Sequence, residues 1–119
     1  MTTQPITIKN GQVTIRPTAN GVWLTQSQIA DMFGVFTAAV NANIRVILKS
    51  GVLHEDRVIR RIRCRNGNIV ERYNLEMITA LAFRLKSENA EVFRRWIIER
   101  ATIPAIVWKM PTNNNAKLN

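Results

Sequence analysis

The chain has 119 residues, 46% of them hydrophobic, and its 17 Lys and Arg against eight Asp and Glu give a net charge of +9. This length fits one hydrophobic core. The sequence has no run of about 18 apolar residues, so it predicts no membrane span, and its N-terminus lacks the pattern of a signal peptide. Without a membrane span or a signal peptide, we expect a cytoplasmic protein. One cysteine (Cys64) and one histidine (His54) cannot make an internal disulfide or a structural zinc site, so we expect no metal or cofactor.

The positive charge is concentrated in one segment. Residues 57–72 contain six basic side chains and one acidic side chain, a net charge of +5, whereas residues 1–56 and 73–119 carry +1 and +3. No basic amphipathic helix with a broad apolar face accompanies this charge. The pattern therefore favours nucleic acid over a membrane as the partner.

The first predicted element is a β-hairpin. Residues 6–15 alternate apolar and polar side chains around Asn10-Gly11, a dipeptide that favours a two-residue hairpin turn. Residues 17–21 are a predicted loop, and residues 22–24 are a short apolar segment that leads to the next element.

Two short helices on a tight turn follow. Thr25 is a predicted N-cap of a helix that ends at Gly34, and the apolar face of this helix consists of Ile29, Ala30, Met32 and Phe33. A second helix is predicted from Thr37 to Lys49. Its apolar residues at helical spacing are Val40, Ile44, Ile47 and Leu48, and Gly51 follows as its end.

From Val58 the period of the sequence changes to two, which predicts an arginine-rich hairpin. Ile62 and Cys64 fall on one face of the first strand, and Arg61, Arg63 and Arg65 on the other. Residues 66–68 turn the chain. The register stays open at this point.

The loop length decides the charge pairing in this hairpin. A two-residue loop places Arg61 opposite Arg72, and a three-residue loop places Arg63 opposite Glu71. The second register is electrostatically easier, because like charges directly opposite each other repel.

Two further helices complete the prediction. Asn74 caps a helix over residues 75–85, and Ser87 caps another, which Pro104 should end or kink. We expect Phe93, Trp96 and Trp23 in the core. The domain is expected to span residues 1–110, and residues 111–119 form a polar tail predicted to be disordered.

Residues 26–44, QSQIADMFGVFTAAVNANI, resemble the helix-turn-helix of phage repressors. Ala30 is the small residue of the first helix, and Gly34 stands at the turn. Apolar anchors occupy four of the expected positions, Ile29, Phe33, Val35 and Val40. The last anchor position departs from the pattern, with Asn43 there and Ile44 one residue later.

A wider resemblance covers roughly residues 12–104. The segment VWLTQSQIADMFGV, then Tyr-Asn-Leu at residues 73–75, and then Ser87, Ala90, Phe93, Arg94 and Trp96 are similar to the RhuM family in the same order. The last segment is also similar to the Bro-N domain of phage antirepressors. This resemblance implies a DNA-binding fold often found on mobile elements. RhuM-type chains are usually longer.

The predicted site follows from the helix-turn-helix. If the second helix occupies a major groove, Asn41 and Arg45 can form bidentate pairs with bases. The first turn of the first helix and the basic hairpin then hold phosphates. The predicted DNA-binding residues are Thr25, Gln26, Gln28, Thr37, Ala38, Asn41, Arg45, Lys49, Arg61, Arg63, Arg65, Asn66, Asn68 and Arg72.

We therefore expect a single α+β domain of the winged helix-turn-helix type that binds double-stranded DNA as a regulator or mobile-element factor, and no enzyme activity. Two alternatives are an antirepressor-like module that binds an acidic protein, and an RNA-binding module. The apolar residues Ile103, Ile106, Val107, Trp108 and Met110 should pack on the domain or on a second copy, which would give a homodimer. No small-molecule substrate is evident.

Overall fold

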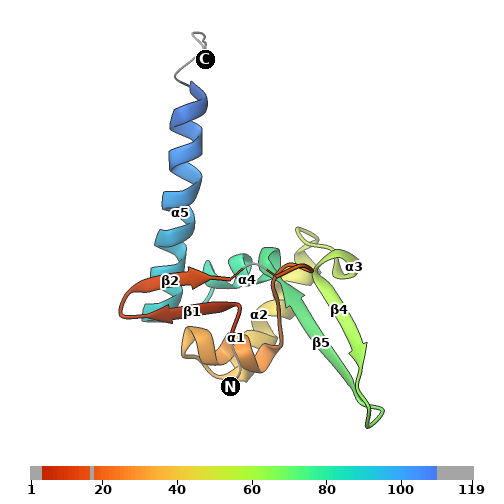
Figure 1. Cartoon of the computed structure of the whole chain (residues 1–119). Coiled ribbons are helices and arrows are strands. Elements are labelled where there is room, and N and C mark those ends of the chain that lie inside the picture. The colour runs from red at the N-terminus through yellow and green to blue at the C-terminus, as the bar shows by residue number, and fades with distance from the viewer. Residues whose placement is uncertain (1–3, 17, 110–119) are drawn as a thin grey trace.

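Five helices and two small antiparallel sheets make up the computed structural model, which describes residues 4–16 and 18–109, with side chains up to residue 102 (Figure 1). Buried residues from all parts of the described chain form one hydrophobic cluster. The chain is thus a compact α+β domain, as the sequence predicts at this level.

The N-terminal hairpin is confirmed. Strand β1 (Ile6–Lys9) pairs with β2 (Gln12–Ile15), so that Ile6 lies opposite Ile15. Asn10 and Gly11 take φ angles of 53° and 74°, the left-handed conformation that a two-residue hairpin turn requires.

The second sheet has the strand order β3-β5-β4 and is antiparallel throughout. Strand β3 (Trp23–Leu24) is the short apolar segment of the prediction. It pairs with β5 (Ile69–Asn74), which also pairs with β4 (Ile59–Arg63). The outer end of the β4–β5 hairpin extends away from the helices (Figure 1).

The turn of the β4–β5 hairpin lies one residue earlier than predicted. The backbone N–H of Cys64 donates to the carbonyl of Asn68 at 2.7 Å, which leaves residues 65–67 as a three-residue loop. Gly67 has a φ angle of 90° and closes this loop, because its position needs a left-handed residue.

This shift makes both predicted registers wrong. Arg61 pairs with Glu71 and Arg60 with Arg72. The expectation that a three-residue loop places an arginine opposite Glu71 holds, but that arginine is Arg61 and not Arg63.

Helices α1 (Gln26–Phe33) and α2 (Thr37–Ser50) form where the sequence predicts them, and their axes are bent by 112°. The Thr25 hydroxyl accepts from the N–H of Gln28, and the Gln28 side chain accepts from the N–H of Thr25, a reciprocal capping box. Gly34 ends α1 in the left-handed conformation.

A one-turn helix, α3 (Glu55–Val58), lies between α2 and β4, in a segment for which the sequence predicts no helix. The side chain of Val58 is buried, and β4 begins at Ile59, one residue later than predicted. A burial pattern over four residues is too short to distinguish a helical turn from a loop.

Helix α4 (Leu75–Ala82) begins at its predicted cap, because the Asn74 Oδ1 accepts from the N–H of Met77 at 3.1 Å. It ends before Leu85, which the sequence placed inside the helix and which is buried in the following loop. The helix therefore ends earlier than its apolar pattern predicts.

Helix α5 (Glu88–Lys109) is capped by Ser87, whose hydroxyl accepts from the N–H of Ala90 at 3.0 Å. It continues through Pro104, so of the predicted end or kink at this residue the end is wrong. A proline removes only one backbone N–H donor from a helix, and the helical turns before and after it keep their hydrogen bonds. Phe93 is fully buried, whereas Trp96 and Trp23 are only half-buried.

The far part of α5 projects from the rest of the chain (Figure 1). The predicted packing of the apolar residues at 103–110 depends on side chains that lie outside the described ones. The predicted disorder of residues 111–119 also lies outside the described residues.

The Asn74 cap can be tested by substitution. Replacing Asn74 by alanine should lower the free energy of unfolding by about 1 kcal/mol, because the first turn of α4 loses its acceptor. Thermal denaturation should then occur roughly 4 °C lower. The control Asn74→Ser keeps an acceptor and should stay near wild type. Equal destabilisation in both variants would show that the cap is not the cause.

Candidate nucleic-acid interface

The outer face of α2 forms a continuous exposed stripe. The predicted site residues Thr37, Ala38, Arg45 and Lys49 are exposed, and Asn41 is half-buried at its edge. Helix α2 contains no acidic residue. Because residues three, four and seven apart share one face of a helix, these side chains lie in one row.

The opposite face of α2 fixes the helix to the domain. Val40, Ile44 and Ile47 are buried in the core. Asn43, which departs from the helix-turn-helix pattern, stands beside this face, where its Oδ1 accepts from Arg84 Nε at 2.8 Å. At this position a hydrogen bond between Asn43 and Arg84 thus replaces the apolar anchor that the motif has there.

The first turn of α1 is occupied by internal bonds. Thr25 and Gln28 bond each other in the capping box, and Gln26 Nε2 donates to the Tyr73 hydroxyl at 3.0 Å. These three predicted phosphate contacts thus have partners within the chain. The bond from Gln26 to Tyr73 connects α1 to β5 of the second sheet.

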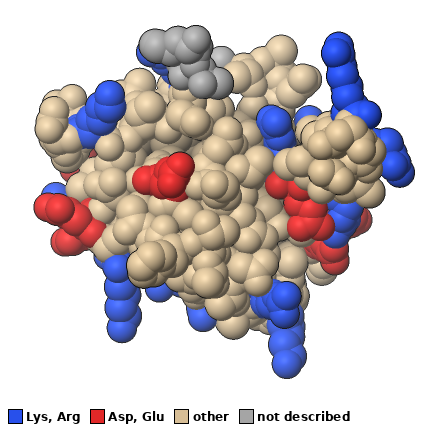
Figure 2. Space-filling model, turned by 90° about the horizontal axis from the view of Figure 1, so that it is seen from below, with Lys and Arg blue, Asp and Glu red and all other residues tan. Residues whose placement is uncertain are grey.

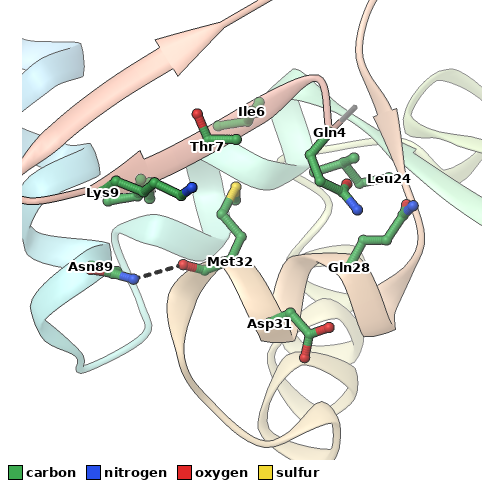
Figure 3. Close-up of a pocket in the computed structure, with 10 residues that line it drawn as sticks. Gln4, Ile6, Thr7, Lys9, Leu24, Gln28, Asp31, Met32 and Asn89 are labelled. Atoms are coloured by element: carbon green, nitrogen blue, oxygen red, sulfur yellow. Dashed lines mark hydrogen bonds between the residues drawn. The ribbon is translucent and has the colours of Figure 1, made fainter. Parts of the chain in front are cut away.

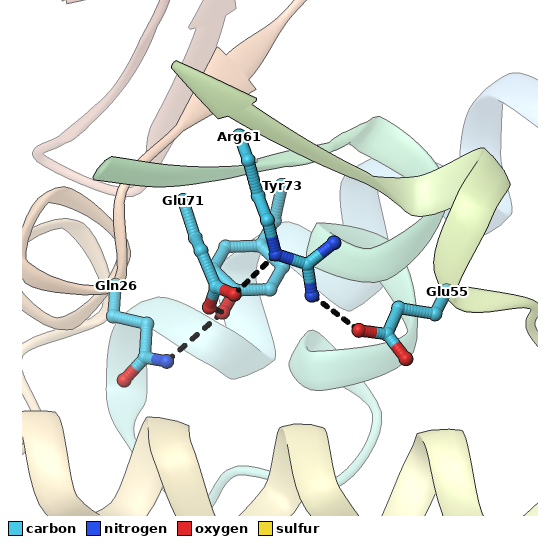
Figure 4. A network of polar contacts seen from close by, with 5 residues as sticks. All are labelled: Gln26, Glu55, Arg61, Glu71 and Tyr73. Carbon is cyan, nitrogen blue, oxygen red and sulfur yellow. Dashed lines mark hydrogen bonds and ion pairs between the residues drawn. The ribbon is translucent and has the colours of Figure 1, made fainter. Parts of the chain in front are cut away.

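A polar network joins the base of the β4–β5 hairpin to α1 and α3 (Figure 4). Arg61 Nε donates to Glu71 at 2.9 Å, and Arg61 Nη2 pairs with Glu55. The Tyr73 hydroxyl donates to Glu71 at 2.9 Å. The two carboxylate bonds raise the pKa of Arg61, that to Glu55 contributing most.

Arg61 therefore has a structural role, because both of its ion pairs are within the chain. Five arginines within residues 57–65 repel one another unless negative charge lies nearby. For Arg61, Glu55 and Glu71 already supply that negative charge. The spacing of residues in the sequence does not predict Glu55 as a partner of Arg61. Glu55 reaches Arg61 only because residues 55–58 form a helical turn.

The outer half of the hairpin carries predicted site residues without carboxylate partners among the described side chains. Arg63 and Arg65 are exposed, and Arg63 Nη1 lies 3.4 Å from the carbonyl of Gly67. The Asn66 side chain accepts from the N–H of Asn68 at 2.9 Å. Asn66 thus shapes the turn, while both arginines remain free for an external anion.

Arg72 lies on the other face of the sheet. Strand alternation separates Arg72 and its neighbour Arg60 from Arg61, Glu71 and Tyr73, which point toward the α1 and α2 side (Figure 4). The structure therefore divides the predicted site. Arg72 does not lie with Arg61 on the face that points toward α1 and α2.

Phe36 is a candidate site residue that the sequence did not indicate. It is the N-cap residue of α2, immediately before Thr37, and its side chain is 85% exposed. Its neighbour Val35 matched an apolar anchor of the motif, and an aromatic residue beside an anchor looks like another core residue. Only the packing shows that its ring points outward.

Figure 2 shows the face viewed from the α1 and α2 side. Lys and Arg side chains project at several points around its margin, Asp and Glu side chains lie at its left, at its right and near its middle, and the surface between them is uncharged. A hollow of about 220 Å³ lies between β1 and α1 and contains both Lys9 and Asp31 (Figure 3). Its mixed charges give it no preference for a polyanion.

Comparison of the chain with protein-family models, curated proteins and solved structures finds no match. Within the part of the chain that the structure describes, no single helix is long and apolar enough to span a membrane, and α1 and α2 reach that composition only as a bent pair.

The buried phenol of Tyr73 predicts a pH dependence. Tyr73 is 1% exposed, and burial is the main cause that raises its pKa above the usual value. The folded state therefore holds the proton more tightly than the unfolded state. This stabilisation is present below about pH 10, the pKa of an unfolded tyrosine, and is lost as the pH rises through the folded pKa.

Urea unfolding between pH 8 and pH 11 measures this effect. Tyr73→Phe should remove the part of the alkaline loss that depends on Tyr73. At pH 8 it should also lower stability by about 1 kcal/mol, because the bonds to Gln26 and Glu71 are lost. An unchanged alkaline slope in this variant would contradict the assignment.

Proposed function

We propose that the chain is a winged helix-turn-helix domain that binds double-stranded DNA. In this proposal α2 is the recognition helix in the major groove, and the β4–β5 hairpin, here called the wing, contacts the phosphate backbone. Regulation of transcription, or a role on a mobile element as the RhuM resemblance implies, is the biological setting that we propose.

The observation that carries the proposal is the outward stripe of α2. An amphipathic helix normally turns its polar face to water, but this stripe combines two cations with small side chains and no carboxylate. Ala38 and Ala42 let a helix approach a groove closely, and Arg45 and Lys49 match its negative charge. Phe36 adds an exposed ring that can meet a thymine methyl group.

The geometry of the two helices also supports the proposal. A bend of 112° between α1 and α2 lies in the range of helix-turn-helix units, and a left-handed glycine makes the turn. No side chain caps the first turn of α2, since Phe36 is its N-cap residue. That end of the helix suits a DNA phosphate.

Within the wing, the contact to phosphate is assigned to Arg63 and Arg65. Arg61 is already paired with two carboxylates, and Arg72 lies on the other face of the sheet. This assignment narrows the sequence-based set of phosphate contacts. It also predicts unequal effects from substitutions that remove the same charge.

The salt dependence of binding to duplex DNA tests the wing. Arg63→Ala should weaken binding to all duplexes alike and reduce the slope of log affinity against log salt by about one, because one phosphate contact is lost. Arg95→Ala is the matched control. It removes the same charge from α5, where Arg95 is 3.5 Å from Glu91, and should leave the slope unchanged.

If the Arg63 and Arg95 variants change the slope equally, the wing does not contact DNA. If the wild-type chain shows no salt-dependent duplex binding at all, the proposed function is wrong. An acidic protein partner or an RNA would then be the next ligand to test.

Asn41 tests the recognition helix separately. With a duplex selected from a random-sequence pool, Asn41→Ala should lower discrimination between selected and random DNA by about 1–3 kcal/mol, the value of one bidentate base contact. The salt slope should stay the same, because asparagine carries no charge. Unchanged discrimination in both Asn41→Ala and Arg45→Ala would exclude α2 as the recognition helix.

A further inference from the structure

A basic groove lies on the face of the second sheet that points away from α1 and α2. It has a volume of about 280 Å³, and its lining includes Thr18, Asn20, Trp23, Arg60, Ile62 and Arg72. Docking of α2 in a DNA groove does not use this face. The groove is therefore separate from the interface proposed above.

Two arginines face each other in this groove without a counter-charge. Arg60 and Arg72 are directly paired across β4 and β5, an arrangement that is destabilising for like charges. All eight Asp and Glu residues of the chain lie within the described residues, and none forms an ion pair with either arginine. The same hairpin shows the contrasting case on its other face, where Arg61 has two carboxylates.

Both guanidinium groups are held in place by their surroundings. The Arg60 guanidinium carbon lies 4.2 Å from the centre of the Trp23 ring, and the indole N–H of Trp23 donates to the Asn20 carbonyl at 2.7 Å. Arg72 Nε is buried without a hydrogen-bond partner. A buried donor without an acceptor is costly, so the groove has an unsatisfied site for an oxygen atom.

We propose that this groove binds a phosphate group in its dianionic form. Two guanidinium charges match a phosphate monoester or free phosphate, which carries close to two negative charges at pH 7. A carboxylate or a DNA phosphodiester carries only one and would leave half of the positive charge without a partner. The planar donors of arginine also fit phosphate oxygens in pairs.

An apolar groove of about 460 Å³ adjoins the site on the far side of Trp23. Its lining includes Ile15, Val22 and Leu75, with the carboxylate of Glu76 also present. Trp23, Thr18 and Asn20 line both grooves. An organic phosphate monoester could therefore place its phosphate between the arginines and its apolar body against Trp23, a combination typical of small-ligand sites.

Nuclear magnetic resonance of the full chain tests the proposal with inorganic phosphate and phenyl phosphate as probes. Both should cause saturable shifts of the Arg72 Nε–H and Trp23 indole N–H signals at pH 7.5. Arg72→Gln should weaken binding at least about tenfold, because a charged hydrogen-bond partner is lost. The matched control Arg95→Gln removes an equal charge from α5, outside both proposed sites, and should leave phosphate binding unchanged.

The exposed Arg60 provides a second variant in case Arg72→Gln does not fold. Arg60→Gln should weaken phosphate binding in the same way, with an unchanged circular dichroism spectrum. Binding should also weaken at pH 5 in the wild-type chain, because phosphate then loses most of its second charge. Absence of saturable shifts, or equal loss in the Arg95 and Arg72 variants, would overturn the proposal.

The choice of probe identifies the source of the phosphate. Tighter binding of phenyl phosphate than of inorganic phosphate indicates an organic monoester, and equal binding indicates free phosphate or a terminal phosphate. Addition of a blunt duplex without terminal phosphates should not displace either probe. Because the duplex occupies the α2 side, failure of phosphate binding and failure of DNA binding are separate results.

Discussion

The contact that organises the domain is the packing of α1 against α5, where Phe33 and Phe93 meet edge to face with ring centres 5.6 Å apart. Both rings are fully buried. On one side Asn89 of α5 donates to the Met32 carbonyl at 2.9 Å, and on the other Arg94 donates to the Ala82 and Leu85 carbonyls. Side chains of α5 thus donate hydrogen bonds to free carbonyl groups at the C-terminal ends of α1 and α4. This fixes α1 and, through the turn at Gly34, also α2.

This arrangement explains several residues that support the RhuM resemblance. Ser87 caps α5, Ala90 and Phe93 are buried, and Arg94 caps the end of α4. Their uses are structural. These contacts turn the apolar face of α2 into the core and leave its other face outside, and the DNA contact that we propose rests on that outer face.

Strand alternation and position along the hairpin together divide the arginines of the β4–β5 hairpin into three groups with different surroundings. Arg61 is paired with Glu55 and Glu71 and stabilises the base of the hairpin. Arg63 and the turn residue Arg65 extend beyond these carboxylates, and Arg60 lies opposite Arg72 on the reverse face. The sequence gives only the net charge of this segment. The electrostatic surroundings of each arginine depend on the residues that lie near it in space.

The sequence by itself determined the elements whose signals are local. Hairpin and helix ends at Asn10, Thr25, Gly34 and Asn74 depend on backbone angles and hydrogen bonds within four residues, so residue type is sufficient. Only the tertiary structure decided which polar groups meet. The bond from Gln26 to Tyr73 spans 47 residues, and the pairing of Arg61 with Glu71 depends on where one glycine closes a turn. A shift of one residue in that turn changes the partner of every arginine in the strand, because opposite positions are set by register and not by composition.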